Sequence, residues 1–211
     1  MKVSRFFARQ YANPSGLFGR FITGFLLNRA NAQSNQLVFS ALDIAEDSRV
    51  LEIGFGGGDL LFKIVEAIGS GSVYGVDPSA AMLKMAEHKK RQCRNPLALQ
   101  LQASRAESLP FDDAQFDRVC SVNTVYFWPD LGKCFSEMER ISRVGGIVVI
   151  GLGSADRLQQ AGYSDQGFIL YSVDAVRQAL LACHFKAIDE IEVKRSKRGS
   201  FHILKYQKVR A

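Results

Sequence analysis

Residues 50–59 read VLEIGFGGGD, an apolar run that carries one acid, Glu52, and ends in a glycine-rich turn. Glycine lets the backbone turn with a positive φ and lets a ligand approach the main chain closely. A dinucleotide site has the spacing GxGxxG, which places a pyrophosphate at the N-terminus of a helix. Counted from Gly54, the sixth position is Asp59, whose carboxylate repels a pyrophosphate. The spacing therefore disfavours NAD and FAD and leaves a GxGxG turn preceded by an acid.

A second acid, Asp77, follows the next apolar run, in residues 72–79 (SVYGVDPS). In a doubly wound sheet an acid at the end of the second strand lies where a ligand binds, and its carboxylate accepts hydrogen bonds from both hydroxyls of a ribose. The alternative is that Asp77 only caps the next helix, because Asp-Pro-Ser is a common helix start. The glycine turn and Asp77 together favour a ligand that contains a ribose.

Short apolar runs alternate with helical patterns from residue 49 onward. We expect helices at 58–68, 79–90, 130–142 and 172–182, and strands at 50–53, 72–76, 97–101, 116–122, 146–151, 187–193 and 201–207. This alternation predicts an α/β fold that is doubly wound, with a mostly parallel seven-stranded sheet and one antiparallel edge strand.

The segment before this body has a different pattern. Apolar residues between Leu17 and Leu26 recur on one helical face, and a second helix is expected over 31–42. We expect residues 1–45 to form an N-terminal helical lid segment and residues 46–211 to form a Rossmann-like domain. Aromatic side chains that a lid would contribute are Phe6, Phe7, Tyr11, Phe18, Phe21 and Phe25.

Composition and charge exclude several classes of protein. Apolar residues make up 47% and charged residues 23% of 211, which excludes a disordered chain, a fibre and a multi-span membrane protein. The four cysteines form no CxxC pair or Cys/His cluster, so we expect no metal site and a reducing, cytoplasmic location. The net charge of +6 is concentrated in basic chain ends. Basic ends attract anionic substrates, nucleic acid or lipid headgroups, or are simply solvated.

The motifs together resemble the class I S-adenosylmethionine-dependent methyltransferases, over roughly residues 48–151. Residues 50–58 match the first motif of this family, and residues 75–79 with Met82 match the second. Residues 106–111 and 116–117 match the stretch around its third and fourth strands, and residues 143–146 match the turn before its fifth strand. Within the family the chain is most similar to small-molecule methyltransferases of ubiquinone and menaquinone biosynthesis.

The resemblance implies that S-adenosylmethionine is the cofactor and S-adenosylhomocysteine its product. It places the three glycines of the GxGxG turn along the amino-acid end of the cofactor, with Glu52 beneath them. Asp77 holds the ribose hydroxyls, Met82 packs on the adenine and Asn123 contacts the methionine portion. The full set of cofactor-binding residues that it implies is Glu52, Gly54, Phe55, Gly56, Gly58, Asp77, Pro78, Met82, Ala106, Glu107 and Asn123.

One position departs from the family pattern. Family members often have an acid just before Ala106 that accepts from the adenine amino group, and this chain has Arg105 there. Arginine carries no hydrogen-bond acceptor. Adenine recognition would then use backbone groups or Glu107.

The expected reaction is methyl transfer to a small, apolar or aromatic acceptor by in-line displacement. Tyr126, Tyr11, Tyr163 and His202 are candidates for a general base, which a hydroxyl or carbon acid would need. One alternative is an RNA methyltransferase of the same fold, although nucleic acid is not expected as a partner because the loop after the fourth strand reads SVNT. A second is a non-catalytic lipid- or protein-binding module. A peripheral membrane contact through the basic N-terminus stays open, and the sequence indicates no oligomeric state.

Overall fold

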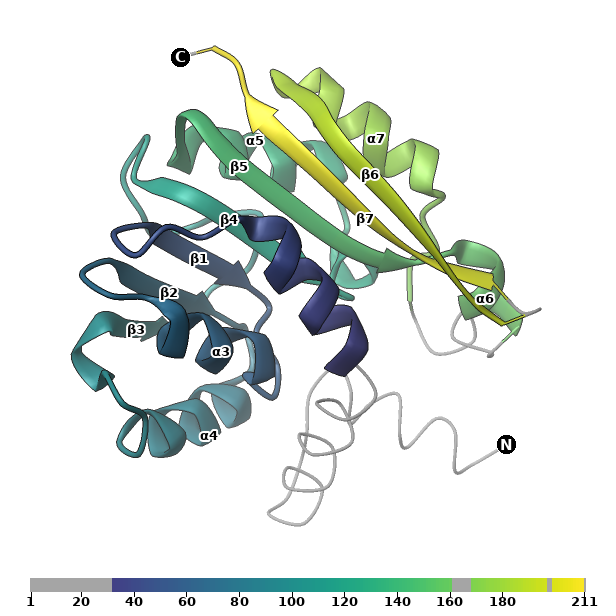
Figure 1. Cartoon of the computed structure of the whole chain (residues 1–211). Helices are drawn as coiled ribbons and strands as arrows, with labels where there is room; N and C mark the ends of the chain where they lie inside the picture. The colour runs from purple at the N-terminus through teal and green to yellow at the C-terminus, as the bar shows by residue number, and fades with distance from the viewer. Residues whose placement is uncertain (1–31, 161–167, 197–198, 211) are drawn as a thin grey trace.

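The computed structural model describes residues 32–160, 168–196 and 199–210 (Figure 1). The expected helix at 17–26, the lid aromatics up to Phe25, and the candidates Tyr11 and Tyr163 lie outside these residues. The strands are β1 (Arg49–Ile53), β2 (Ser72–Val76), β3 (Leu99–Gln102), β4 (Phe116–Val122), β5 (Ser142–Gly153), β6 (Phe185–Ser196) and β7 (Gly199–Lys208). The helices cover residues 32–42, α3 (Asp59–Ala67), α4 (Ala80–Lys90), α5 (Leu131–Ile141), α6 (Ala155–Gln160) and α7 (Val173–Ala182). Short 3₁₀ turns cover Pro96–Ala98 and Val125–Phe127.

The seven strands form one sheet in the order β3-β2-β1-β4-β5-β7-β6. Every pairing from β3 to β5 is parallel, whereas β7 pairs antiparallel with both β5 and β6. The expected α/β fold with a mostly parallel seven-stranded sheet is therefore confirmed. The reversed strand β7 lies second from the edge, because the final hairpin joins the sheet through its second strand and leaves β6 outermost.

Helices cover both faces of the sheet, and each face has its own hydrophobic cluster (Figure 1). Successive strand residues point to opposite faces, so Leu51 and Ile53 enter the cluster under α5 and α7. Val50 enters the cluster under the 32–42 helix, α3 and α4. Burial on both sides explains why these strands read as continuous apolar runs in the sequence. None of the helices within the described residues is long and apolar enough to cross a membrane.

The 32–42 helix is fixed to the rest of the structure at three points, two on the sheet and one on α3. At its C-terminal end, the guanidinium of Arg118 on β4 donates to the carbonyl oxygens of Leu42 (2.7 Å) and Asp43 (3.0 Å). In its middle, Val38 is fully buried against Gly151 of β5. In its first turn, the side-chain amide of Asn35 donates to Asp59 at the start of α3 (2.9 Å). The helix therefore belongs to the packed body. The division into a lid and a domain at residue 45 stays a prediction.

Replacing Gly151 with alanine tests this packing. A Cβ at this position would lie 2.7 Å from Val38 Cγ2 and 2.8 Å from Phe201 Cζ, both in the core. We expect Gly151→Ala to lower the free energy of unfolding by about 1–3 kcal/mol, the usual cost of overpacking. Urea denaturation measures it. Gly132→Ala on α5 is the control, since only the Asp130 carboxylate lies near, and should change stability by less than about 1 kcal/mol. Equal effects of the two substitutions would contradict the packing.

Candidate functional site: the carboxyl ends of β1, β2 and β4

The glycine turn lies where β1 ends and α3 begins. Gly54, Gly56 and Gly58 have φ angles of 75°, 52° and 77°, a conformation that favours glycine. A Cβ at Gly54 would collide with the side chain of Thr124, whereas a Cβ at Gly56 would meet no atom within 4 Å. Gly54 is therefore required for packing against the segment after β4, and Gly56 faces open space where a ligand can approach the backbone.

Asp77 joins the end of β2 to the glycine turn. Its carboxylate accepts from the Gly56 N–H (2.9 Å) and from the Ser79 N–H (2.8 Å), and the residue is 7% exposed. Burial raises the pKa of this carboxyl, and the two backbone hydrogen bonds oppose the shift. The N-cap of α4 is Ser79, whose hydroxyl accepts from the Met82 N–H. Ser79 therefore caps α4, whereas Asp77 joins the N-cap residue to the glycine turn.

Glu52 is a buried carboxylate directly before the turn. It is 3% exposed, and its Oε2 has no hydrogen-bond partner among the described residues. Burial raises its pKa well above the ordinary range, and the neighbouring carboxylates of Asp77 and Asp59 raise it further. A buried polar atom without a partner is rare in proteins and calls for an explanation, for example a bound group. Here it marks a position suited to a hydrogen-bond donor or a cation.

The end of β4 meets the same site. Asn123 adopts a left-handed backbone conformation (φ 56°), and its N–H donates to the Gly151 carbonyl (2.8 Å). Its side-chain oxygen accepts from the Tyr126 hydroxyl (3.2 Å). The Ser121 hydroxyl donates to the Ile53 carbonyl (2.8 Å) and also contacts the Thr124 hydroxyl. These contacts tie β4 to both neighbouring strands at their carboxyl ends.

The structure thus brings five of the expected residues together at the strand ends: Glu52, Gly54, Gly56, Asp77 and Asn123. The apolar members of the expected set are more deeply placed. Phe55 and Met82 are buried in the cluster under α3 and α4, and Ala106 is buried in the cluster on the other face. Glu107 is half-buried, and its carboxylate lies 3.9 Å from the exposed Arg105. Gly58 and Pro78 lie in the two loops that hold the site.

Two expected base candidates lie within the described residues. Tyr126 is buried, and its hydroxyl is hydrogen-bonded to groups of the protein. His202 lies on β7 with its Nε2 2.8 Å from the Ser200 hydroxyl, and burial lowers its pKa, so that it is neutral near pH 7. Trp128, which follows Tyr126 in sequence, packs on Phe135 in the core. Of the aromatic run 126–128, only Phe127 is notably exposed (37%).

Sequence reasoning missed the residues whose hydrogen bonds connect the strand ends, above all Ser121, Thr124 and Gly153. Their partners are distant in the chain, and no local pattern marks them. Asn35 was also missed, although its polar side chain in an otherwise apolar helical face was a usable signal.

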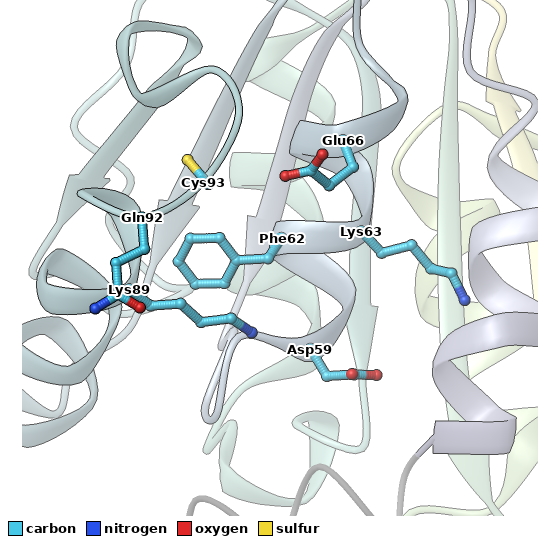
Figure 2. A pocket seen from close by; sticks show the side chains of 7 residues that line it. All are labelled: Asp59, Phe62, Lys63, Glu66, Lys89, Gln92 and Cys93. Carbon is cyan, nitrogen blue, oxygen red and sulfur yellow. The ribbon is translucent and has the colours of Figure 1, made fainter.

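A groove of about 410 Å³ lies elsewhere, between α3 and α4. It is lined by Asp59, Phe62, Lys63, Glu66, Lys89, Gln92 and Cys93 (Figure 2). The Lys89 ammonium lies over the Phe62 ring, 4.4 Å from its centroid. None of Glu52, Asp77 and Asn123 lines this groove, so it is not the candidate site. No group of three or more His, Cys, Asp or Glu side chains within the described ranges is arranged to hold a metal.

A doubly wound sheet with a glycine turn after β1 and an acid at the end of β2 defines a nucleoside-binding α/β protein. A family model described as a methyltransferase domain matches residues 51–150. The chain belongs to the S-adenosylmethionine-dependent methyltransferases, as the first motifs indicated, and is an enzyme of this class with S-adenosylmethionine as its cofactor.

Named relatives agree with this family. The chain is 29% identical over 129 residues to an uncharacterized methyltransferase, YdaC, of Bacillus subtilis, covering 61% of this chain and 69% of that one. It is 34% identical over 113 residues to demethylmenaquinone methyltransferase of Staphylococcus epidermidis, covering 53% of this chain. The match spans about half (46%) of that relative's length.

A solved structure with the same fold is geranyl diphosphate C-methyltransferase of Streptomyces coelicolor, in complex with Mg²⁺, geranyl diphosphate and S-adenosyl-L-homocysteine. The TM-score is 0.76 at 15% identity, over 87% of this chain and 81% of that one. At this identity the likeness concerns the fold alone.

The buried Glu52 carboxyl predicts a particular pH dependence of stability. Because its pKa is raised in the folded chain, the folded state keeps a proton that the unfolded state loses above the ordinary value of 4.5. Its contribution to the free energy of unfolding therefore falls as the pH rises. We expect the free energy of unfolding, measured by urea denaturation, to fall less between pH 5 and pH 8 in Glu52→Gln than in the unchanged chain. Glu87→Gln, at an exposed position, is the control. Parallel pH profiles for all three proteins would show that Glu52 is not a buried, uncompensated acid.

Proposed function

We propose that this protein transfers a methyl group from S-adenosylmethionine, bound at the carboxyl ends of β1, β2 and β4, to a small apolar or aromatic acceptor. The observation that carries the proposal is the Glu52 carboxylate, which is buried without a partner among the described residues beside a glycine turn that faces open space. S-adenosylmethionine fits these two features. Its ammonium group suits the Glu52 carboxylate, and its amino-acid portion is small enough to lie against the backbone of the glycine turn. The class of the chain supports the same donor.

Each residue at the strand ends has a role in this proposal. The backbone at Gly54 and Gly56 lines the amino-acid portion, and Glu52 stabilises its ammonium through charge. Asp77 keeps lone pairs beyond those used by the Gly56 and Ser79 N–H groups, since a carboxylate has about four acceptor sites. Those lone pairs accept from the ribose hydroxyls. Asn123 contacts the methionine portion, Met82 packs on the adenine, and Ala106 lies near the adenine edge.

Glu107 takes the adenine edge in this proposal. Its carboxylate is held near Arg105, which occupies the position where an acid is common in the family. Phe55 and Pro78 shape the two loops on either side of the ribose. The acid that the family pattern would place before Ala106 is thus replaced by one that follows it.

The bound cofactor supplies an electrophilic methyl group, and the chain supplies geometry. Holding the acceptor and the methyl in line removes most of the entropic barrier to a bimolecular displacement, which amounts to several kcal/mol. Excluding water from such a site also prevents loss of the methyl group to solvent. The proposed lid over residues 1–45 would serve this purpose. No base is assigned, and neutral His202 remains the described candidate if the acceptor must lose a proton.

The acceptor is proposed to be apolar because of an aromatic pair beside the site. Phe127 is 37% exposed, and its ring lies 4.7 Å from that of Phe168. Relatives named for demethylmenaquinone and for 2-phytyl-1,4-naphtoquinone support an aromatic ring with an apolar tail. The match covers about half of the length of those relatives, and the identity of the acceptor is therefore part of the proposal.

Calorimetric titration of the whole chain with S-adenosylmethionine, S-adenosylhomocysteine and NAD tests the cofactor site. We expect micromolar binding of both sulfur ligands and none of NAD, because Asp59 repels a pyrophosphate. NAD binding, or the absence of binding by both sulfur ligands, would refute the assignment. A steep salt dependence of RNA binding, measured in parallel, would instead support the RNA methyltransferase alternative.

Asp77→Ala tests the ribose position. We expect the affinity for S-adenosylhomocysteine to fall at least tenfold, because the ribose hydrogen bonds and the fixed position of Gly56 are both lost. Asp112→Ala, at an exposed acid in the loop before β4, is the control and should bind normally. Unchanged affinity in a folded Asp77→Ala protein would place the ribose elsewhere.

Phe127→Ala tests the acceptor surface. A reduced naphthoquinone with an apolar tail is the probe, with methyl transfer followed from radiolabelled S-adenosylmethionine. We expect KM for this acceptor to rise about five- to tenfold, from the loss of apolar contact area, with cofactor affinity unchanged. Leu181→Ala, at an exposed apolar position on α7, should have no effect. A rise in KM for both variants, or for neither, would remove Phe127 from the acceptor site.

A further inference from the structure

The hydroxyl of Tyr126 lies between the carboxyl ends of β4 and β5. It accepts from the Gly153 N–H (2.5 Å) and donates toward Asn123 Oδ1 (3.2 Å), with the Gly153 carbonyl slightly farther away (3.4 Å). The residue is 2% exposed and belongs to the cluster under α5 and α7. A phenol buried in this way has its donor and an acceptor site occupied by the protein itself.

The residue that Tyr126 holds is constrained in a second way. The Asn123 backbone is left-handed at φ 56°, a conformation that is unfavourable for most residues other than glycine. Its N–H is fixed to the Gly151 carbonyl of β5 (2.8 Å). Because Tyr126 also holds the side-chain oxygen, both the backbone and the side chain of Asn123 are fixed. The orientation of its side-chain amide is therefore set before a ligand binds.

We propose that Tyr126 is a positioning residue, which orients the Asn123 amide toward the methionine portion of S-adenosylmethionine and does not itself act on the acceptor. This inference rests on the proposed function, in which Asn123 contacts the cofactor. Pre-orientation matters because a side chain held in its binding geometry loses no rotamer freedom when the ligand binds. Tyr126 therefore acts through Asn123, in contrast to a general base.

Tyr126 also reaches the acceptor side of the site. Its carbonyl oxygen accepts from the Ile169 N–H (2.9 Å), and its ring lies 6.0 Å from that of Phe168. Phe168 in turn contacts Phe127, the exposed aromatic ring of the proposed acceptor surface. The same buried residue thus fixes the cofactor-side amide and the chain segment that carries the acceptor-side ring.

A double-mutant cycle on the whole chain tests the proposal, with the dissociation constant of S-adenosylhomocysteine as the readout. Asn123→Gly removes the side chain and tolerates the positive φ, and we expect it to weaken binding about tenfold. Tyr126→Phe should weaken binding about fivefold. The double variant should bind within twofold of Asn123→Gly alone, because Tyr126 has no route to the ligand once Asn123 is gone. Effects that multiply to about fiftyfold would overturn the proposal.

Tyr171→Phe is the matched control. It also removes a tyrosine hydroxyl that donates to a backbone carbonyl, that of Trp128 (2.8 Å), from the same side of the sheet. We expect its affinity for S-adenosylhomocysteine to stay within twofold of the unchanged chain. An equal loss in Tyr171→Phe and Tyr126→Phe would assign the effect to general loosening. A normal affinity in Tyr126→Phe, or in Asn123→Gly, would also overturn the inference, while failure of the unchanged chain to bind would refute the proposed function beneath it.

A crystal structure of the unchanged chain with S-adenosylhomocysteine is the second measurement, needed if Tyr126→Phe does not fold. We expect the Asn123 amide within hydrogen-bond distance of the amino-acid part of the ligand while Oδ1 still accepts from Tyr126. A ligand that contacts the Tyr126 hydroxyl directly, or leaves the Asn123 side chain untouched, would overturn the proposal.

Discussion

The hydrogen bond from the Gly56 N–H to the Asp77 carboxylate joins two loops that are 21 residues apart in the chain. Parallel strands place their carboxyl ends at one edge, but nothing in strand pairing fixes the loops beyond that edge. This bond does so, and the Ser79 N–H holds the other carboxylate oxygen. The bond lies beside the two features on which the site depends, the open space at Gly56 and the buried acid Glu52.

The burial of Glu52 is costly, and no hydrogen bond to its Oε2 from the described residues offsets that cost. Burial and the nearby carboxylates of Asp77 and Asp59 all disfavour the charged form. A cationic ligand reverses this balance, because it adds an opposite charge at close range and gives the unpartnered oxygen a donor. Such a ligand binds only the folded chain, so its binding stabilises the fold by mass action. The raised pKa of Glu52 and its unpartnered oxygen therefore favour a ligand that carries positive charge at this position.

The elements that the sequence revealed are those with local signals. The apolar run and glycines at 50–58 and the acid at 77 identified the first two strand ends. The helix expected at 172–182 corresponds to α7, whose N-cap is Ser172. The extension of β5 back to Ser142 and the short helix α6 were missed, since both depend on neighbours that are distant in sequence. The position of β7 between β5 and β6 likewise depends on tertiary contacts and not on a local sequence pattern. The hydrogen bonds that connect β4 to its neighbours through Ser121 and Tyr126 leave no local pattern in the sequence. The sequence alone therefore indicates Tyr126 only as a candidate base.

The two halves of the site differ in how they are built, and this bears on how one fold accommodates different acceptors. The cofactor side consists of strand ends joined by short hydrogen bonds, at Gly56, Asp77 and Asn123. The proposed acceptor side consists of Phe127, in the 3₁₀ turn after β4, and Phe168, and the sheet does not dictate the identity of either side chain. Loops tolerate substitution better than strand ends do. Geranyl diphosphate C-methyltransferase has the same fold at 15% identity, which shows that this sheet tolerates wide changes of sequence. Tyr126 contacts both halves. Its hydroxyl is hydrogen-bonded to Asn123 on the proposed cofactor side, and its ring and carbonyl contact residues 168 and 169 on the proposed acceptor side.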